Sequence, residues 1–168
     1  ATEGISWDFR NYVRSILKDV DQISPLHELV FSELTYFVDE RGLLVPQPRP
    51  VPMTAMIRLI VNTAKIIRSD LQIDFGDGGW EALKKVIQIR NRITHPKGIK
   101  DLQVSDDDVE TAQAGFFWFF NMVVYVMERT LHEYKIDLEI TKKIVSNLIA
   151  GDSETLTLYN QMDSRNDS

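Results

Sequence analysis

The sequence predicts an all-α protein, an up-and-down bundle of about five to six helices. Apolar residues recur at steps of three and four along most of its 168 residues, which is the period of an amphipathic helix. The sequence shows no extended period-two alternation, which is the pattern of a half-buried strand. It also shows no internal repeat. The chain is 43% apolar and 26% charged, a balance typical of a globular domain with a core.

Two helices are expected in the N-terminal part of the chain. The first follows the apolar pattern of residues 5–20. The second begins at Ser24 and Pro25, because serine is a favoured N-cap and proline fits the first helical turn. Its apolar pattern continues to Val38 before Gly42 ends it.

The middle of the chain predicts a connector and two further helices. Residues 43–52 contain four prolines, so we expect an extended connector, which could also serve as a docking strip for a partner. A third helix carries its apolar residues over 56–67, and glycine and aspartate over 74–79 indicate a turn. The fourth helix runs from 80 to 94, because Pro96 disfavours helical geometry at the residue before it.

The C-terminal part predicts two more helices. Ser105 is a strong N-cap, and the carboxylates of residues 106–108 suit the positive end of the helix dipole. This fifth helix is expected to reach Tyr134. A sixth helix is expected over 138–150, ending at Gly151.

The length of the chain suits one ordinary domain and is too short for two large ones. We expect a single helical domain over residues 1–150 and a polar, flexible tail over 151–168. The longest apolar run, residues 114–127, is too short to span a bilayer. With no signal peptide at the start of the sequence, a cytoplasmic protein without a membrane partner is the expectation.

Composition limits the chemistry further. Cysteine is absent, which excludes disulfides, thiol catalysis and cysteine-ligated zinc. The three histidines do not have the spacing of a metal-binding helix face, so neither a metal nor a cofactor is expected. The formal net charge of -6 argues against a general nucleic-acid coat protein and leaves room for a local basic site.

Arg90 is the unusual residue of the fourth helix. A projection at 100° per residue gathers Leu83, Val86 and Ile87 on one face, and Arg90 falls near the middle of that face. A buried arginine is costly unless an anion or a wet cleft receives it. A structural ion pair, or a side chain that reaches outward, would explain this arginine taken alone. Asn91 lies at the rim of the same face.

His95 follows one turn later, where the helix ends. An arginine can hold a phosphate and a histidine can pass a proton, whereas capping or packing is the alternative role for His95. Residues 82–100 contain six basic and no acidic side chains, and the rest of the chain has a net charge of -12. Binding a phosphate backbone needs such a basic stretch, although solvated lysines also produce one. The candidate RNA contacts are Lys84, Arg92, Lys97 and Lys100.

The segment RNRITH, residues 90–95, resembles the R-x4-6-H motif of HEPN domains, which are all-α proteins. In that motif a polar residue, often asparagine, follows the arginine, as Asn91 does here. The motif also lies at the end of a helix, before a loop and a long helix. Outside residues 80–98 the resemblance concerns only the architecture.

The resemblance implies a metal-independent endoribonuclease of a defence or toxin–antitoxin system, acting as a homodimer in which two motifs face each other. Arg90 would hold the scissile phosphate, and His95 would be the general acid or base for attack by the RNA 2′-hydroxyl. Asn91 would orient one of these groups or the phosphate. A cognate antitoxin or other protein would be a further partner.

Several alternatives stay open. Many HEPN domains have lost catalysis, so a dimerisation or interaction module of a larger regulatory or defence protein is the second hypothesis. Nucleotide binding at the same basic site is the third. The aromatic run of residues 116–120 fits either a central buried helix or a homodimer seam. Asp74 and Asp77 are interpreted as turn and cap residues, and the acidic run 106–108 as part of a helix cap.

Overall fold

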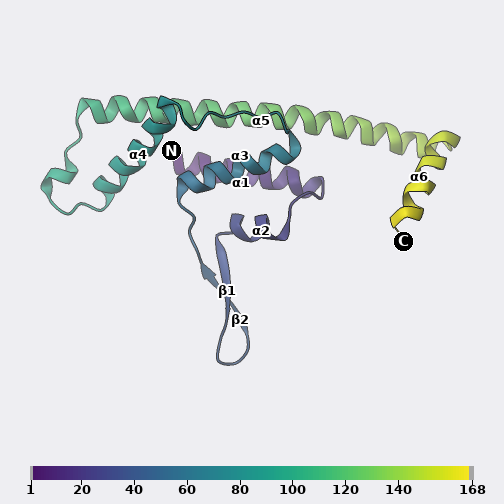
Figure 1. Ribbon diagram of the computed structural model, residues 1–168, viewed down its shortest axis with the longest axis horizontal. Helices are drawn as coiled ribbons and strands as arrows, with labels where there is room; N and C mark the ends of the chain where they lie inside the picture. Colours follow the sequence, from purple (N-terminus) through teal and green to yellow (C-terminus); the bar gives the residue numbers. More distant parts are fainter. Residues whose placement is uncertain (1, 167–168) are drawn as a thin grey trace. The chain divides into compact units, whose positions relative to one another are not determined.

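The computed structural model describes residues 2–166 and confirms the all-α helical fold (Figure 1). The chain divides into two compact units, Ala1–Thr130 and Leu131–Ser168, and α5 contributes residues to both. The elements are α1 (Thr2–Asp19), α2 (Pro25–Phe31), β1 (Leu34–Val38), β2 (Leu44–Pro48), α3 (Met53–Ile67), α4 (Gly78–Thr94), the 3-10 helix η1 (Ile99–Leu102), α5 (Asp106–Ile149) and α6 (Ser153–Asn166).

The core of the first unit lies between α1, α3, α4 and the N-terminal part of α5. Each helix turns one apolar stripe inward, as the sequence period predicts. Tyr12 in α1 also donates a hydrogen bond of 3.0 Å to the carbonyl oxygen of Met127 in α5. The buried side chains of this core include Phe9, Val13, Leu17, Ile57, Ile60, Val61, Leu83, Phe119, Val123 and Val126.

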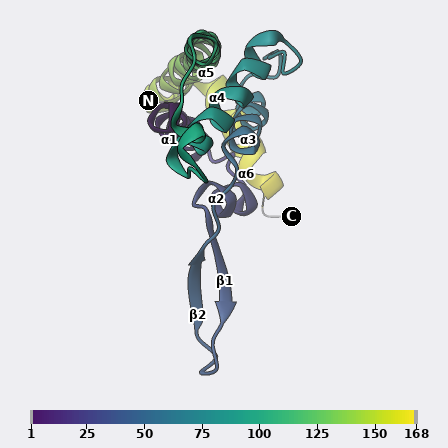
Figure 2. The ribbon, with the colours of Figure 1, turned by 90° about the vertical axis from the view of Figure 1, so that its left-hand side faces the viewer.

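The prediction that the second helix continues to Val38 is wrong. α2 ends at Phe31, and Glu33 has a φ of +52°, which lies outside the right-handed helical region. The β-branched and aromatic residues that follow form β1, which pairs with β2 in an antiparallel hairpin. The extended backbone predicted for the proline-rich segment is therefore present, but as a strand. The hairpin extends away from the helices of the first unit (Figures 1 and 2).

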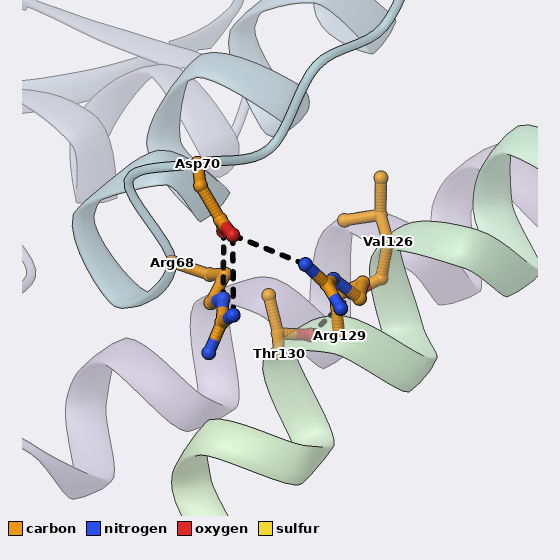
Figure 3. Close-up of polar contacts among 5 residues, drawn as sticks. All are labelled: Arg68, Asp70, Val126, Arg129 and Thr130. Atoms are coloured by element: carbon orange, nitrogen blue, oxygen red, sulfur yellow. Dashed lines mark hydrogen bonds and ion pairs between the residues drawn. The ribbon is translucent and has the colours of Figure 1, made fainter.

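A cluster of charged side chains fastens the segment after α3 to α5. Arg68 donates from Nε to the Oδ1 of Asp70 at 2.6 Å, and Arg129 of α5 donates to Oδ2 of the same carboxylate at 3.0 Å (Figure 3). Hydrogen bonding from Arg68, with a smaller contribution from the charge of Arg129, holds the pKa of Asp70 below its ordinary value. Next to it, Thr130 donates to the carbonyl oxygen of Val126 at 2.8 Å. The segment that connects α3 to α4 is thus fixed to α5 where it leaves α3.

The predicted break between the fifth and sixth helices is wrong. α5 continues without interruption through residues 135–137, because the sequence there contains neither glycine nor proline. It ends at Ile149, and Gly151, with a φ of +73°, makes the turn that follows. The polar segment expected to be a flexible tail contains α6, whose start is fixed by Asp152. The Asp152 carboxylate accepts hydrogen bonds from the Thr155 backbone N–H at 2.9 Å and hydroxyl at 2.6 Å. Residues 167–168 of that tail lie outside the described residues.

Candidate functional site

The start of α4 is fixed by Asp77, which confirms the interpretation of this residue as a cap. Its Oδ1 accepts the backbone N–H of Trp80 at 2.9 Å, and its Oδ2 accepts the indole N–H of Trp118 in α5 at 2.7 Å. Asp74 closes the preceding turn by accepting the N–H of Gly76 at 2.7 Å. One carboxylate therefore both caps α4 and ties it to α5.

Aromatic rings fill the space around that cap. Phe75 meets Trp80 edge to face at 4.9 Å between ring centroids, and Trp80 lies 5.6 Å from Trp118. The guanidinium of Arg58 in α3 stands over the Phe75 ring at 4.7 Å. Edge-to-face pairs and cation–π contacts add to the stabilisation that buried area gives. The first turn of α4 is thereby packed against both α3 and α5.

Gly115 lets α4 and α5 approach closely. A Cβ at this position would lie 2.8 Å from the backbone nitrogen of Leu83 and 2.9 Å from the carbonyl carbon of Ala82. Because the obstructing atoms belong to backbone, they cannot move aside by a change of rotamer. This contact sets where α4 lies, and with it the position of the helix end that carries the RNRITH segment.

The end of α4 is where sequence analysis predicts it. His95 is the C-cap, and its backbone N–H donates to the carbonyl oxygen of Asn91 at 3.0 Å. The loop that follows is closed by Asp101, whose Oδ2 accepts the backbone N–H groups of Lys97 at 2.7 Å and Gly98 at 3.2 Å. The segment after the motif is thus a structured turn that leads into η1.

The predicted burial of Arg90 is wrong. Its side chain is 50% exposed, because this part of the apolar face of α4 lies beyond the core and borders a pocket. The guanidinium makes two contacts there: it pairs with Glu3 of α1 at 2.7 Å and donates to the Oδ1 of Asn91 at 3.0 Å. The side-chain amide that follows the arginine therefore holds it in place.

The pocket has a volume of about 610 Å³ and lies among α1, the start of α3 and the second half of α4. Trp7, 57% exposed, and Ile87 contribute apolar surface to it, and Arg90 and Asn91 line it. His95 is not among its lining residues, although it is exposed on the same helix end. The structure therefore brings Arg90 and Asn91 together and leaves His95 outside their pocket.

The basic residues predicted to contact RNA fall into two groups. Lys84 pairs with Glu81 at 2.6 Å, and Arg92 pairs with Asp108 at 2.7 Å. The pKa of Asp108 lies below its ordinary value, because the Ser105 backbone N–H and Arg92 both donate hydrogen bonds to its carboxylate. These two cations are partly neutralised by acids of the chain itself.

The second group, Lys97 and Lys100, lies beyond the motif. Lys97 is in the turn after His95, and Lys100 is in η1. Both residues are exposed. Their charges therefore face solvent next to the motif.

The Ser105 cap predicted for α5 is confirmed, and it is reciprocal. The Ser105 hydroxyl accepts the N–H of Asp108 at 3.1 Å, and the Asp108 carboxylate accepts the N–H of Ser105 at 3.1 Å. Since Asp108 also holds Arg92, the start of α5 is bound to the last turns of α4. The loop that carries His95 is anchored at both ends.

Arg10 and Glu33 are pocket residues that sequence analysis missed. Arg10 of α1 donates to Glu33 at 2.6 Å, and the second carboxylate oxygen accepts the N–H of Val51 at 2.9 Å. Burial raises the pKa of Glu33, but the hydrogen bonds from Val51 and Arg10 outweigh it, so that its pKa lies below the ordinary value. Arg10 follows Phe9 in the core stripe of α1, and a buried arginine has no local sequence signal that names its partner.

Comparison of the chain with protein-family models, with curated proteins and with solved structures gave no match. Within the described part of the chain, histidine, aspartate and glutamate side chains nowhere gather in a group of three that could hold a metal ion. Over the same residues, each helix is either too short or too polar to cross a membrane. Any assignment of function therefore rests on the motif and its surroundings.

Proposed function

We propose that this chain is a metal-independent endoribonuclease of the HEPN type, acting as a homodimer. The observation that carries the proposal is the state of Arg90: its side chain is half exposed and borders a pocket, with Asn91 holding the guanidinium. Its other partner, Glu3, is 66% exposed, so this ion pair is open to solvent and to competing anions. A guanidinium that is held by a neutral amide and takes part in such an exposed ion pair can exchange the carboxylate for a phosphate.

Each motif residue has one role in the proposed reaction. Arg90 binds the scissile phosphate and stabilises the negative charge that grows on it in the transition state. His95 takes the proton of the RNA 2′-hydroxyl, or gives one to the leaving 5′-oxygen, so that cleavage leaves a 2′,3′-cyclic phosphate. Asn91 fixes the direction of the guanidinium. The chain's own side chains supply the acid–base and electrostatic groups that this reaction needs.

A second copy of the chain completes the proposed site. Arg90 lines the pocket and His95 does not, so for a phosphate bound in this pocket we assign the acid–base group to the second copy. When two motifs face each other, His95 of one copy can serve a phosphate held by Arg90 of the other. Lys97 and Lys100 would meet the RNA backbone first, because Lys84 and Arg92 are already paired with Glu81 and Asp108.

Cleavage of single-stranded RNA in the presence of EDTA tests the proposal. We expect the wild type to cleave and both Arg90→Ala and His95→Ala to lose at least about a hundredfold in rate, the usual contribution of a catalytic acid, base or charge stabiliser. Arg41→Ala and His132→Ala are the matched controls, because each removes an exposed residue of the same type elsewhere. Equal rates in all five proteins would overturn the assignment.

The second candidate, a non-catalytic interaction module, is favoured by the ion pair between Arg90 and Glu3. In that case the arginine serves to join α4 to α1. Neither the wild type nor any variant would then cleave RNA, and Arg90→Ala would lower the melting temperature only by the small amount that an exposed ion pair contributes. Measuring thermal unfolding together with cleavage separates the two candidates.

The setting of the proposed enzyme follows from the same resemblance. We propose a cytoplasmic role in a defence or toxin–antitoxin system, with a cognate antitoxin or another protein partner to restrain the nuclease. Light scattering of the purified protein tests the homodimer. A monomer at micromolar concentration that still cleaves RNA would contradict the two-copy site.

A further inference from the structure

The two edges of the hairpin differ in the backbone groups they offer. Arg49 donates to the carbonyl oxygen of Glu33 at 2.7 Å, and Asp39 donates to that of Leu43 at 2.9 Å. Hydrogen-bonded pairs alternate with non-bonded pairs along an antiparallel ladder. Thr35 and Phe37 therefore direct their N–H and C=O groups toward β2. The backbone groups of the intervening residues point outward, and these are Leu34, Tyr36 and Val38.

The outer edge of β2 is blocked by proline. Pro46 lies opposite Tyr36, and Pro48 lies opposite Leu34, so both prolines occupy outward-facing positions of β2. Proline has no backbone N–H and cannot donate to a further strand. The outer edge of β1 keeps its donors at the corresponding positions. A third strand can therefore add to β1 and not to β2.

One face of the hairpin consists of aliphatic side chains, two prolines and one tyrosine. Residues directly opposite each other in the register share a face, and three such pairs fall on the same side. Tyr36 is 51% exposed, Val38 63% and Leu44 72%. An isolated two-stranded hairpin is marginally stable in water, and it gains from a third strand or from packing on this face. The face consists of Leu34, Tyr36, Val38, Leu44, Pro46 and Pro48.

The root of the hairpin is fixed in place before any strand is added. Glu33, which precedes β1, is held by Arg10 of α1 and by the N–H of Val51, which follows β2. Both legs are thus joined to each other and to the first helix. An edge that is already oriented loses less conformational entropy when it binds.

We propose that the β1 edge binds an extended segment of another protein by β-augmentation. The segment places apolar side chains next to Tyr36 and Val38 on the face that these share. It carries lysine or arginine where it passes Glu40 and Asp39, whose carboxylate also accepts the N–H groups of Arg41 and Leu43. Main-chain hydrogen bonds supply the affinity and the alternate side chains the selectivity. The binding site is independent of the RNA-cleaving role proposed above.

A second copy of this chain fits the same edge less well. An antiparallel pair of β1 strands centred on Tyr36 would place Asp39 of the second copy opposite Glu33, whose carboxylate already occupies Arg10 and the Val51 N–H. Asp39 would therefore meet a carboxylate there and no free basic group, which disfavours the strand pair. Basic residues in a different chain would instead complement the acidic end of β1.

The test uses the full chain and a fluorescein-labelled peptide in which valine and isoleucine alternate with threonine between terminal lysine pairs. Fluorescence anisotropy measures binding, and amide hydrogen exchange followed by NMR locates it. We expect saturable binding together with new protection of the amides of Leu34, Tyr36 and Val38. The same peptide with glutamate in place of lysine should bind about tenfold more weakly.

Tyr36→Pro removes one outward N–H, as Pro46 does on the other strand, and should weaken binding about tenfold. Tyr36→Val is its matched control and keeps the donor. Protection of the Thr35 and Phe37 amides, which face β2, reports whether the hairpin stays folded in each variant. Should Tyr36→Pro lose that protection, Pro46→Val combined with Pro48→Val gives a second test, because it should open a second edge and raise the stoichiometry to two peptides.

Three results would overturn the proposal: no binding of the lysine peptide, equal binding by a folded Tyr36→Pro variant, or protection of the outward amides that rises with protein concentration alone. The last result would mean that a second copy occupies the edge.

Discussion

Arg10 in α1 donates a 2.6 Å hydrogen bond to Glu33, the residue that begins the hairpin. The Arg10 side chain is only 11% exposed, so its charge depends on this carboxylate for compensation. Glu33 in turn accepts the N–H of Val51 on the far leg of the hairpin. The pair therefore joins the first helix, the hairpin and one wall of the pocket beside Arg90.

Glu33→Gln should lower the free energy of unfolding by about 2–4 kcal/mol, because it leaves the Arg10 charge buried without an anion. Urea denaturation at pH 7 measures the change. Glu40→Gln, which neutralises an exposed carboxylate in the hairpin turn, should stay within about 0.5 kcal/mol of the wild type. Replacing Arg10 by methionine in the Glu33→Gln background should recover part of the loss, and unchanged stability of the single variant would contradict this account.

Stability should fall as the pH falls from about 4.5 toward 2, because of Glu28. Hydrogen bonds from Arg14, and from Lys18 to a smaller extent, lower the pKa of Glu28 from 4.5 to about 2 in the folded chain. Between these values the unfolded chain takes up a proton that the folded chain does not, so the stabilisation is complete above the unfolded pKa and lost as the pH approaches the folded one.

Glu28→Gln should remove this part of the pH dependence, a contribution of about 1 kcal/mol because the pair is partly exposed to solvent. Urea midpoints measured from pH 7 to pH 2 compare the variant with the wild type. If both proteins lose stability in parallel over that interval, Glu28 is not the group responsible.

Gly115→Ala should destabilise the protein by about 1–3 kcal/mol, because the added methyl group meets the backbone of Ala82 and Leu83. Gly4→Ala is the matched control: its Cβ would meet nothing within 4 Å, in the exposed first turns of α1. Alanine should there be neutral or add about 0.5–1 kcal/mol, since glycine is a poor helix former. Thermal unfolding of both variants measures these changes. Equal changes in stability for Gly115→Ala and Gly4→Ala would show that α4 and α5 do not approach as described.

Glu3→Gln should release Arg90 from its ion pair and raise the rate of RNA cleavage about twofold to fivefold, the equivalent of an exposed ion pair of about 0.5–1 kcal/mol. The melting temperature should change little for the same reason. Single-turnover cleavage at low salt is the suitable measurement. A slower rate would mean that Glu3 positions Arg90 for catalysis and does not compete with the phosphate.

The sequence predicted those elements whose determinants are local. Asp77 caps α4, Ser105 and Asp108 cap α5, and Pro96 stops α4 just before it, each through contacts within a few residues. Such signals can be recognised without knowing the rest of the fold. The position of the RNRITH segment at a helix end was therefore predicted correctly.

The hairpin was missed because its determinant is not local. Apolar residues between Leu26 and Val38 keep a helical spacing, and the prolines of the partner strand first suggest an irregular connector. Residues 34–38 form a strand because they pair with β2 and because the left-handed conformation of Glu33 ends the helix before them. A pairing partner cannot be read from the periodicity of one segment.

The exposure of Arg90 was mispredicted for a related reason. A helical projection shows which residues share a face, but it does not show how far along the helix that face is covered. The core covers Leu83, whereas Val86 and Ile87 are only partly buried and Arg90 borders the pocket. The absence of His95 from the lining of that pocket likewise involves the C-cap, where the backbone leaves the helical conformation (φ -129°, ψ 59°).

The shared use of Asp77 has a consequence for how this protein folds. The same carboxylate caps α4 and accepts a hydrogen bond from the indole N–H of Trp118 in α5. Formation of the first turn of α4 and docking of α5 are therefore coupled. A chain shortened before α5 should keep the hydrogen bond from Trp80 to Asp77 and lose the one from Trp118, so that α4 is still capped but no longer tied to a neighbouring helix. The C-terminal end of α4, which carries Arg90 and His95, would then no longer be held in its position, although its own residues are unchanged.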